Sequence, residues 1–181
     1  MSQAVGALDA LGGLLSNGVL AWGLAACGMA QLSKLVIELV VHRRWRPAVL
    51  VETGGMPSSH SALMTGTAAG LGWELGFADP LFALAAVLCF VVLYDASGVR
   101  RAAGLTAQRV NGLPDGLWDT QAEDGDSTTE PVLRPLKENL GHTRTEVLVG
   151  SLMGPLVALP GLAVLGSPWQ IALRAGWLPL G

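Results

Sequence analysis

The stretch "GVLAWGLAACGMAQLSKLVIELVV", residues 18–41, is almost entirely apolar. A helix that crosses the hydrocarbon core of a bilayer needs about 20 mostly apolar residues, so this stretch predicts a membrane-spanning helix. Its two charged residues, Lys34 and Glu38, stand four apart, and His42 follows after another four. Residues at this spacing share one face of a helix. The resulting polar stripe is either a self-paired, inward-facing set or part of a substrate site.

The composition of the whole chain also points to lipid as its solvent. Hydrophobic residues make up 51% of the 181 residues and charged residues only 14%, whereas a soluble domain carries about 25% charged residues. The formal net charge is −3, and we expect no nucleic-acid partner. The two cysteines, Cys27 and Cys89, both fall in apolar stretches, which favours small core residues over a disulfide or a metal pair.

Three further apolar stretches follow the first, and together they predict an all-α integral membrane bundle of about four spanning helices. Pro155 and Pro160 are expected to kink the last of them. A shorter stretch at 168–180 is expected to form a C-terminal helix that lies in the interface or re-enters the membrane. We expect a single membrane domain over residues 1–181, with spans at about 18–41, 61–78, 80–97 and 144–165.

The long polar stretch at about 98–142 separates the third span from the fourth. Its first part, "GVRRAAGLTAQRVNGL", has the pattern of an amphipathic helix. The next part, residues 114–131, carries six acidic residues and no basic one among many turn formers, which predicts a flexible loop. The acidic residues lack the spacing of a calcium loop, so we expect no metal site there.

The basic residues predict the orientation of the chain in the membrane. Cytoplasmic loops carry an excess of Lys and Arg, and the turn between the second and third spans contains Asp79 but no cation. We therefore expect the 98–142 loop to be cytoplasmic, the N-terminus to be outside, and the protein to lie in the cell (inner) membrane. Nine of the eleven Lys and Arg residues support this orientation: Arg43, Arg44, Arg46, Arg100, Arg101, Arg109, Arg134, Lys137 and Arg144.

The motif "GGMPSSHSA", residues 54–62, has the features of an anion site at the start of a helix. Gly55 and its neighbouring glycine let the backbone approach a ligand closely, and the free N–H groups of the following helix attract anions. His60 falls in the first turn, where it can donate a proton. An ordinary capped helix start would explain Pro57 and Ser58, but not the double glycine together with the histidine.

The motif "LKENLGHTRTEVLVG", residues 136–150, supplies a second histidine. His142 and Glu146 stand four apart, so the carboxylate can hold the imidazole in one tautomer. The alternative is an ordinary polar helix start with Thr143 as its cap. Lys137 is close enough in sequence to reach an anion bound beside His142.

A third motif, "YDASGVRRAAG", residues 94–104, places Arg100 and Arg101 after the third span. The positive-inside bias alone accounts for such cations. Beside two histidines and a glycine-rich helix start, however, the two guanidinium groups would complete a phosphate pocket. Asp95 is expected to orient one of them.

Two pairs of glycines at a spacing of four predict how the helices pack. Gly66 and Gly70 lie in the second predicted span, and Gly150 and Gly154 lie in the fourth. Glycines at this spacing permit close approach of membrane helices. We therefore expect these two spans to touch and to bring the two histidines together.

Taken together, the three motifs resemble the divergent branch of the type-2 phosphatidic acid phosphatases, which is also described as acid phosphatase and vanadium-dependent haloperoxidase related. The resemblance covers about residues 31–154. In the parent superfamily the first motif is a lysine followed by Arg-Pro. Here Arg46 and Pro47 resemble it, with Leu39 at the place of the lysine.

The other two parent motifs are also matched in part. The parent Pro-Ser-Gly-His corresponds to residues 57–60, with Ser59 in place of glycine. The parent Ser-Arg motif ends in His and Asp. His142 and Glu146 resemble that pair, with the longer carboxylate, and Leu136 stands at the place of the arginine.

The resemblance implies a metal-independent, cofactor-independent mechanism. His142 would attack phosphorus, Glu146 would orient it, and His60 would protonate the departing alkoxide. The resemblance and the motifs predict phosphate contacts from Arg100, Arg101, Lys137, Ser58, Ser59 and Gly55. Lys34 and Arg46 are further candidates for substrate binding.

Two functions fit these expectations. The first is a membrane phosphatase or phosphotransferase that acts on a lipid phosphate, with membrane lipid as its surroundings and a homodimer left open. The second is a non-catalytic membrane protein of the same fold that binds an anionic lipid or a partner protein. The two histidines and Glu146 favour the first, and the replaced lysine and arginine favour the second.

Overall fold

The computed structural model describes residues 10–50, 54–113, 136–138 and 140–177, and within them the chain is helical and contains no strand. The acidic stretch 114–131 lies outside the described residues. After a helical segment at 10–16, the elements are α2 (Gly18–Val40), η1 (Pro47–Leu50), α3 (Ser59–Leu75), α4 (Pro80–Ser97), α5 (Val99–Asn111), α6 (Arg144–Pro160), η3 (Gly161–Leu165) and α7 (Pro168–Arg174). The prediction of an all-α membrane bundle is confirmed.

Three helical stretches are long and apolar enough to cross a membrane: Gly18–Val40, Pro80–Asn111 and Arg144–Leu165. Their large side chains point outward as well as inward. Val36, Phe90 and Leu156 are 57%, 71% and 73% exposed, one on each stretch. Such surfaces are unfavourable in water and suited to lipid, because the hydrocarbon core demands apolar side chains around internally bonded helices.

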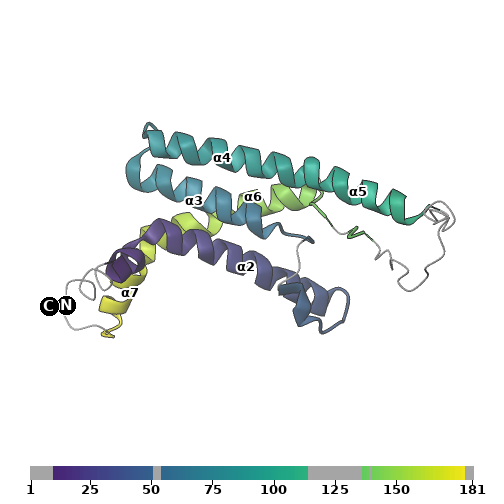
Figure 1. Ribbon diagram of the computed structural model, residues 1–181. Helices are drawn as coiled ribbons and strands as arrows, with labels where there is room; N and C mark the ends of the chain where they lie inside the picture. Colours follow the sequence, from purple (N-terminus) through teal and green to yellow (C-terminus); the bar gives the residue numbers. More distant parts are fainter. Residues whose placement is uncertain (1–9, 51–53, 114–135, 139, 178–181) are drawn as a thin grey trace, which may run out of the picture.

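The remaining predicted span, 61–78, is the central helix of the bundle. α3 has 17 residues and packs against α2, α4 and α6 (Figure 1). At 1.5 Å per residue it is only about 26 Å long, and Gly76, with a φ of 92°, ends it. α3 is also rich in small residues. Ala62 is fully buried beside Ala26 and Ala30 of α2, and these three alanines form the core.

Glycines allow α3 and α6 to cross at close range. A methyl group added at Gly66 would lie 3.2 Å from the carbonyl oxygen of Gly154. One added at Gly150 would collide with the backbone of Ser58. The prediction that the second and fourth spans touch through their small residues is confirmed.

α5 continues almost along the line of α4 through Gly98 (Figure 1). The two helices together cover 32 residues, or about 48 Å, whereas the hydrocarbon core of a bilayer is about 30 Å thick. The predicted amphipathic helix after the third span is confirmed in α5, which projects beyond the rest of the bundle.

The C-terminal part folds back against the start of α2. Pro155 lies within α6 and Pro160 ends it, and the chain continues as one wide turn, η3. Trp22 of α2 donates a hydrogen bond from Nε1 to the carbonyl oxygen of Gly166 at 2.7 Å. α7 then has only seven residues, too few to cross a membrane. The rest of the predicted 168–180 helix is described only as far as residue 177.

Candidate active site

Four helix ends meet at one end of the bundle: the C-terminal ends of α2 and α4 and the N-terminal ends of α3 and α6 (Figure 1). Two backbone hydrogen bonds join them. The N–H of Ser58, before α3, donates to the carbonyl oxygen of Glu146 in α6 at 3.0 Å. The N–H of His142 donates to the carbonyl oxygen of Ala96 in α4 at 2.9 Å. The three sequence motifs are thereby brought to the same end.

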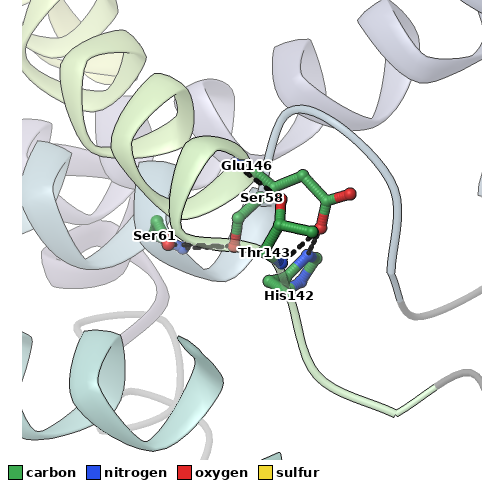
Figure 2. Close-up of polar contacts among 5 residues, drawn as sticks. All are labelled: Ser58, Ser61, His142, Thr143 and Glu146. Atoms are coloured by element: carbon green, nitrogen blue, oxygen red, sulfur yellow. Dashed lines mark hydrogen bonds and ion pairs between the residues drawn. The ribbon is translucent and has the colours of Figure 1, made fainter. Parts of the chain in front are cut away.

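The side chains of His142 and Glu146 form the predicted polar pair (Figure 2). His142 is not in the first turn of the helix as expected, because it precedes the N-cap Thr143 of α6. Nδ1 of His142 lies 3.1 Å from Oε2 of Glu146, and His142 is buried. An ionised carboxylate only accepts hydrogen bonds, so Nδ1 must carry the imidazole proton. The lone pair of the neutral ring is therefore on Nε2, which is the arrangement that a nucleophilic histidine needs.

Glu146 also caps its own helix. The same Oε2 atom accepts a hydrogen bond from the N–H of Thr143 at 3.0 Å, and Thr143 Oγ1 accepts one from the N–H of Glu146 at 3.2 Å. This is a capping box, which stabilises a helix N-terminus whatever the neighbouring side chains do. The expected cap at Thr143 is thus present together with the histidine pair, and the two do not exclude each other.

Ser58 has a structural place that differs from the predicted one. It is fully buried, and its Oγ accepts hydrogen bonds from the N–H of Ser61 at 3.3 Å and from the Oγ of Ser61 at 2.9 Å (Figure 2). Its N–H is already bonded to Glu146. The prediction of a phosphate contact from the Ser58 amide is therefore corrected, because that donor serves the contact between α3 and α6. Ser59 is the first residue of α3, where a backbone N–H has no partner within the helix.

His60 lies in the first turn of α3, on the side of the site that is exposed. Partial burial lowers the pKa of His60, and the nearby positive charges of His142, Arg100 and Lys34 lower it further. His60 therefore interacts electrostatically with His142 and with Arg100 at the start of α5.

A cavity of about 550 Å³ opens beside the pair, between α2, η1, the 54–56 segment and the residues Glu138, Leu140 and Gly141. Five of the predicted site residues line it: Lys34, Arg46, Gly55, Arg101 and Glu146. The other lining residues are Ile37, Glu38, His42, Val49, Gly54, Met56, Glu138, Leu140 and Gly141. The walls thus carry three Lys or Arg residues, three carboxylates and several apolar side chains.

The other predicted site residues lie around the cavity and not in its walls. Arg100 is exposed and its Nε contacts Oδ2 of Asp95 at 2.5 Å, which confirms that Asp95 orients one of the two arginines. Lys137 is exposed on the 136–138 segment. Their contacts with phosphate remain predictions. In the described ranges, no three His, Cys, Asp or Glu side chains are grouped so that they could hold a metal ion.

The interaction of α5 with the segment before His142 was not predicted. Asn111 holds that segment at both polar groups of Leu136, through Nδ2 to the carbonyl oxygen at 2.8 Å and through Oδ1 to the N–H at 2.9 Å. At Gly104 a methyl group would lie 2.6 Å from the carbonyl oxygen of Glu138. Gly141, with a φ of 78°, touches the backbone of Arg101. In the sequence, only the small residues Gly104 and Ala107, on one face of α5, indicated that another segment packs closely there.

The second unpredicted detail is the division of the polar stripe on α2. His42 Nδ1 pairs with Glu38 Oε2 at 2.9 Å, whereas Lys34 is 4% exposed and forms no ion pair with them. The self-paired alternative therefore holds for two members of the stripe but not for the third.

The fold and the paired histidine together define a helical membrane protein with a polar site at one end of its bundle. The sequence profile of the Divergent PAP2 family matches residues 15–157, and the chain belongs to this family. It is 39% identical over 149 residues to "Uncharacterized membrane protein YuiD" of Bacillus subtilis (strain 168), which covers 81% of this chain and 94% of the relative. No solved structure matches the chain.

Proposed function

We propose that this membrane protein is a phosphatase or phosphotransferase that acts on a lipid phosphate through a phosphohistidine intermediate. The observation that carries the proposal is the 3.1 Å contact between Nδ1 of His142 and Oε2 of Glu146, at the end of the bundle where His60 and a cavity with Lys and Arg side chains also lie. A lipid phosphate is the substrate class because the site stands at the end of membrane-spanning helices.

The chemistry proceeds in two steps. Nε2 of His142 attacks phosphorus, and the bond from phosphorus to the ester oxygen breaks. His60 in its protonated form gives its proton to the departing alkoxide, which leaves as an alcohol. Water then attacks the phosphohistidine with neutral His60 accepting its proton, and inorganic phosphate leaves. In a phosphotransferase, an acceptor alcohol takes the place of water.

Glu146 has a positioning role in both steps. It fixes the proton on Nδ1, and its negative charge stabilises the positive charge that His142 gains when Nε2 forms a bond to phosphorus. Arg101 lines the cavity and Arg100 interacts electrostatically with His60, which supports a role for both in offsetting the charge of the phosphate oxygens.

The test is acid-quench labelling with a phosphorus-labelled substrate, run beside steady-state assays on alkyl and aryl phosphates. His142→Ala should abolish both labelling and turnover. His60→Ala should lose turnover of alkyl phosphates yet keep some activity on an activated aryl phosphate, whose phenolate departs without a proton. Labelling that persists in His142→Ala, or unchanged rates in both variants, would contradict the proposal.

Two variants at Glu146 separate its chemical role from its helix-capping role. Glu146→Gln keeps an acceptor for Thr143 and for Nδ1 but removes the charge, so the helix start should be retained while labelling becomes slow. Glu146→Ala removes the cap as well and should cost a further ~1 kcal/mol of stability. Equal labelling rates in wild type and Glu146→Gln would show that the carboxylate serves the helix alone.

A non-catalytic protein that binds an anionic lipid or a partner protein is the second candidate. The observation in its favour is that the amide of Ser58 and the carboxylate of Glu146 are both used to hold helices in place. In that case the purified protein should release no phosphate from any lipid phosphate, and His142→Ala should bind lipid as wild type does.

A further inference from the structure

Lys34 is the buried cation of the candidate site. It lies on α2, more than a turn before the end of the helix, and only 4% of its surface is exposed. The Cβ that would be added at Gly55 lies 4.0 Å from Cδ of Lys34, so the side chain runs alongside the start of the "GGMPSSHSA" motif. Lys34 and Glu146 line the same cavity. Lys34 therefore reaches both halves of the site from a third helix.

The ammonium group of Lys34 has no hydrogen-bonded or ion-paired partner in the part of the chain that the structure describes. The carboxylate of Glu146 acts on it only through electrostatics, without a direct contact between the two groups. Burial of an unpaired ammonium costs several kcal/mol. A protein retains such a group where something outside the chain compensates the charge, and the cavity is the place from which that compensation can come.

The carboxylates of the cavity supply it only in part. Glu146 interacts with Lys34 electrostatically, but each carboxylate is already held by another group. Glu38 pairs with His42, Glu138 accepts a hydrogen bond from Asn111 at 2.8 Å, and Glu146 is held by His142 and Thr143. On the opposite wall, Arg101 also forms no ion pair among the described residues. Lys34 and Arg101 thus line the cavity without forming an ion pair among the described residues, and the ligand that these two cations fit is an anion.

We infer that Lys34 is the principal phosphate-holding cation of this protein and that the ligand is a phosphate monoester dianion. The inference rests on the proposed function and names the group that binds its substrate. Leu39 occupies the place of the parent lysine, but it is 47% exposed. Five residues along a helix turn about 140° around its axis. Lys34, five residues before Leu39, thus lies on the inward face of α2. The helix still supplies a lysine to the site, but from a different position.

The experiment measures binding of inorganic phosphate to the full chain in detergent, by calorimetry and by the rise in Tm that phosphate causes. Lys34→Met keeps the aliphatic stem without the charge. We expect it to weaken phosphate binding at least about tenfold, the usual effect of losing a charged hydrogen bond. Arg109→Met removes an exposed cation elsewhere on α5 and should bind as wild type does.

A second readout follows from the missing partner. Without phosphate, Lys34→Met and Lys34→Gln should have a higher Tm than wild type, because they remove a buried charge that forms no hydrogen bond and no ion pair. A lower Tm in both, or failure of both variants to fold, would mean that the ammonium supports the fold and would overturn the inference. Absence of phosphate binding to wild type, or equal binding by Lys34→Met, would also overturn it.

Two further measurements are needed. One distinguishes a lipid headgroup from free phosphate as the ligand, and the other distinguishes failure of the phosphohistidine chemistry from failure of the Lys34 inference. In His142→Ala protein, which should not turn over, a decyl phosphate that binds more tightly than inorganic phosphate identifies a lipid headgroup as the ligand. Equal binding identifies free phosphate and contradicts the monoester assignment. Lys34-dependent binding without labelling of His142 would refute the proposed chemistry alone. Labelling with unchanged binding in Lys34→Met would refute this inference alone.

Discussion

His60 of α3 and Arg100 of α5 interact electrostatically. Burial lowers the pKa of His60, and the neighbouring cations, Arg100 among them, lower it further. In the proposed chemistry His60 must hold a proton to expel the alkoxide. The protonated fraction of His60 falls as the pH rises through its pKa, so kcat/KM for an alkyl phosphate should begin to fall below the ordinary histidine value of about 6.5.

Arg100→Gln tests this coupling. Removal of the positive charge favours the imidazolium form, so the pKa of His60 should rise and the alkaline limb of the pH profile should move to higher pH. The position of the limb is the readout, since the rate itself also depends on phosphate contacts. Arg109→Gln, farther along α5, should leave the limb in place. A limb that stays fixed in Arg100→Gln, or that is equally present for an activated aryl phosphate, would rule out His60 as the acid.

The contact between His142 and Glu146 was predicted from helical spacing, but His142 lies before the N-cap Thr143 and therefore outside α6. The two side chains meet because the Glu146 carboxylate turns back towards the N-cap in the capping box. The sequence could not show where the Lys34 side chain points. Its stripe is equally compatible with pairing along α2 and with a site formed by other helices. Only the packing of α2 against the rest of the bundle decides between them, and that packing depends on contacts far apart in sequence.

The crossing of α3 and α6 is the element on which the site depends. Gly150 lies against the backbone of Ser58, and Ser58 in turn donates its N–H to Glu146. Gly150→Ala should therefore push the two helices apart at the point that joins the motifs of His60 and His142. Overpacking of this kind costs about 1–3 kcal/mol. The expected result is a lower unfolding free energy in detergent together with slower labelling of His142.

Gly28→Ala is the matched control for that substitution. Gly28 lies on an exposed side of α2, and an added methyl group would find nothing within 4 Å. Since alanine is the better helix former, this variant should be as stable as wild type or more stable by about 0.5–1 kcal/mol. A Gly150→Ala protein that behaves like Gly28→Ala would show that the helices adjust without cost and that the crossing does not hold the site.

The presence of the helices was predictable from the lengths of the apolar stretches. The contact between α3 and α6 was predictable from their two pairs of glycines. The end of α3 was not predictable from the apolar stretch alone, because that stretch continues to Ala78 whereas the helix ends at Gly76. The docking of the 136–142 segment on α5 could not be derived. It relies on side-chain contacts such as Asn111 with Leu136, which join residues 25 positions apart, and no local pattern encodes such a pair.

For the molecule as a whole, the cations divide unevenly between the two ends of the bundle. The site end carries eight of the described Lys and Arg residues outside the cavity-lining Lys34: Arg43, Arg44, Arg46, Arg100, Arg101, Arg109, Lys137 and Arg144. At the other end stands Arg174, whose Nη1 donates to the carbonyl oxygen of Val164 at 3.0 Å. The α3–α4 turn at that end contains Asp79 and no cation. By the positive-inside rule the site end should face the cytoplasm.

Single cysteines introduced at the two ends test this orientation. The background replaces Cys27 and Cys89 with alanine. Gln108→Cys places a thiol on the exposed side of α5 at the site end, and Ala78→Cys places one in the exposed α3–α4 turn at the other end. In intact cells a membrane-impermeant maleimide should modify Ala78→Cys readily and should reach Gln108→Cys only after permeabilisation.

The two positions control for each other, because both thiols are exposed and both must react once the membrane is opened. The reverse pattern would place the His142 site outside the cell and would require its lipid phosphate to come from the outer leaflet. Modification of both thiols in intact cells would show that the chain inserts in two orientations, and half of the sites would then face each side. Protection of Gln108→Cys alone is the result that places the phosphate chemistry, and the phosphate it releases, on the cytoplasmic side.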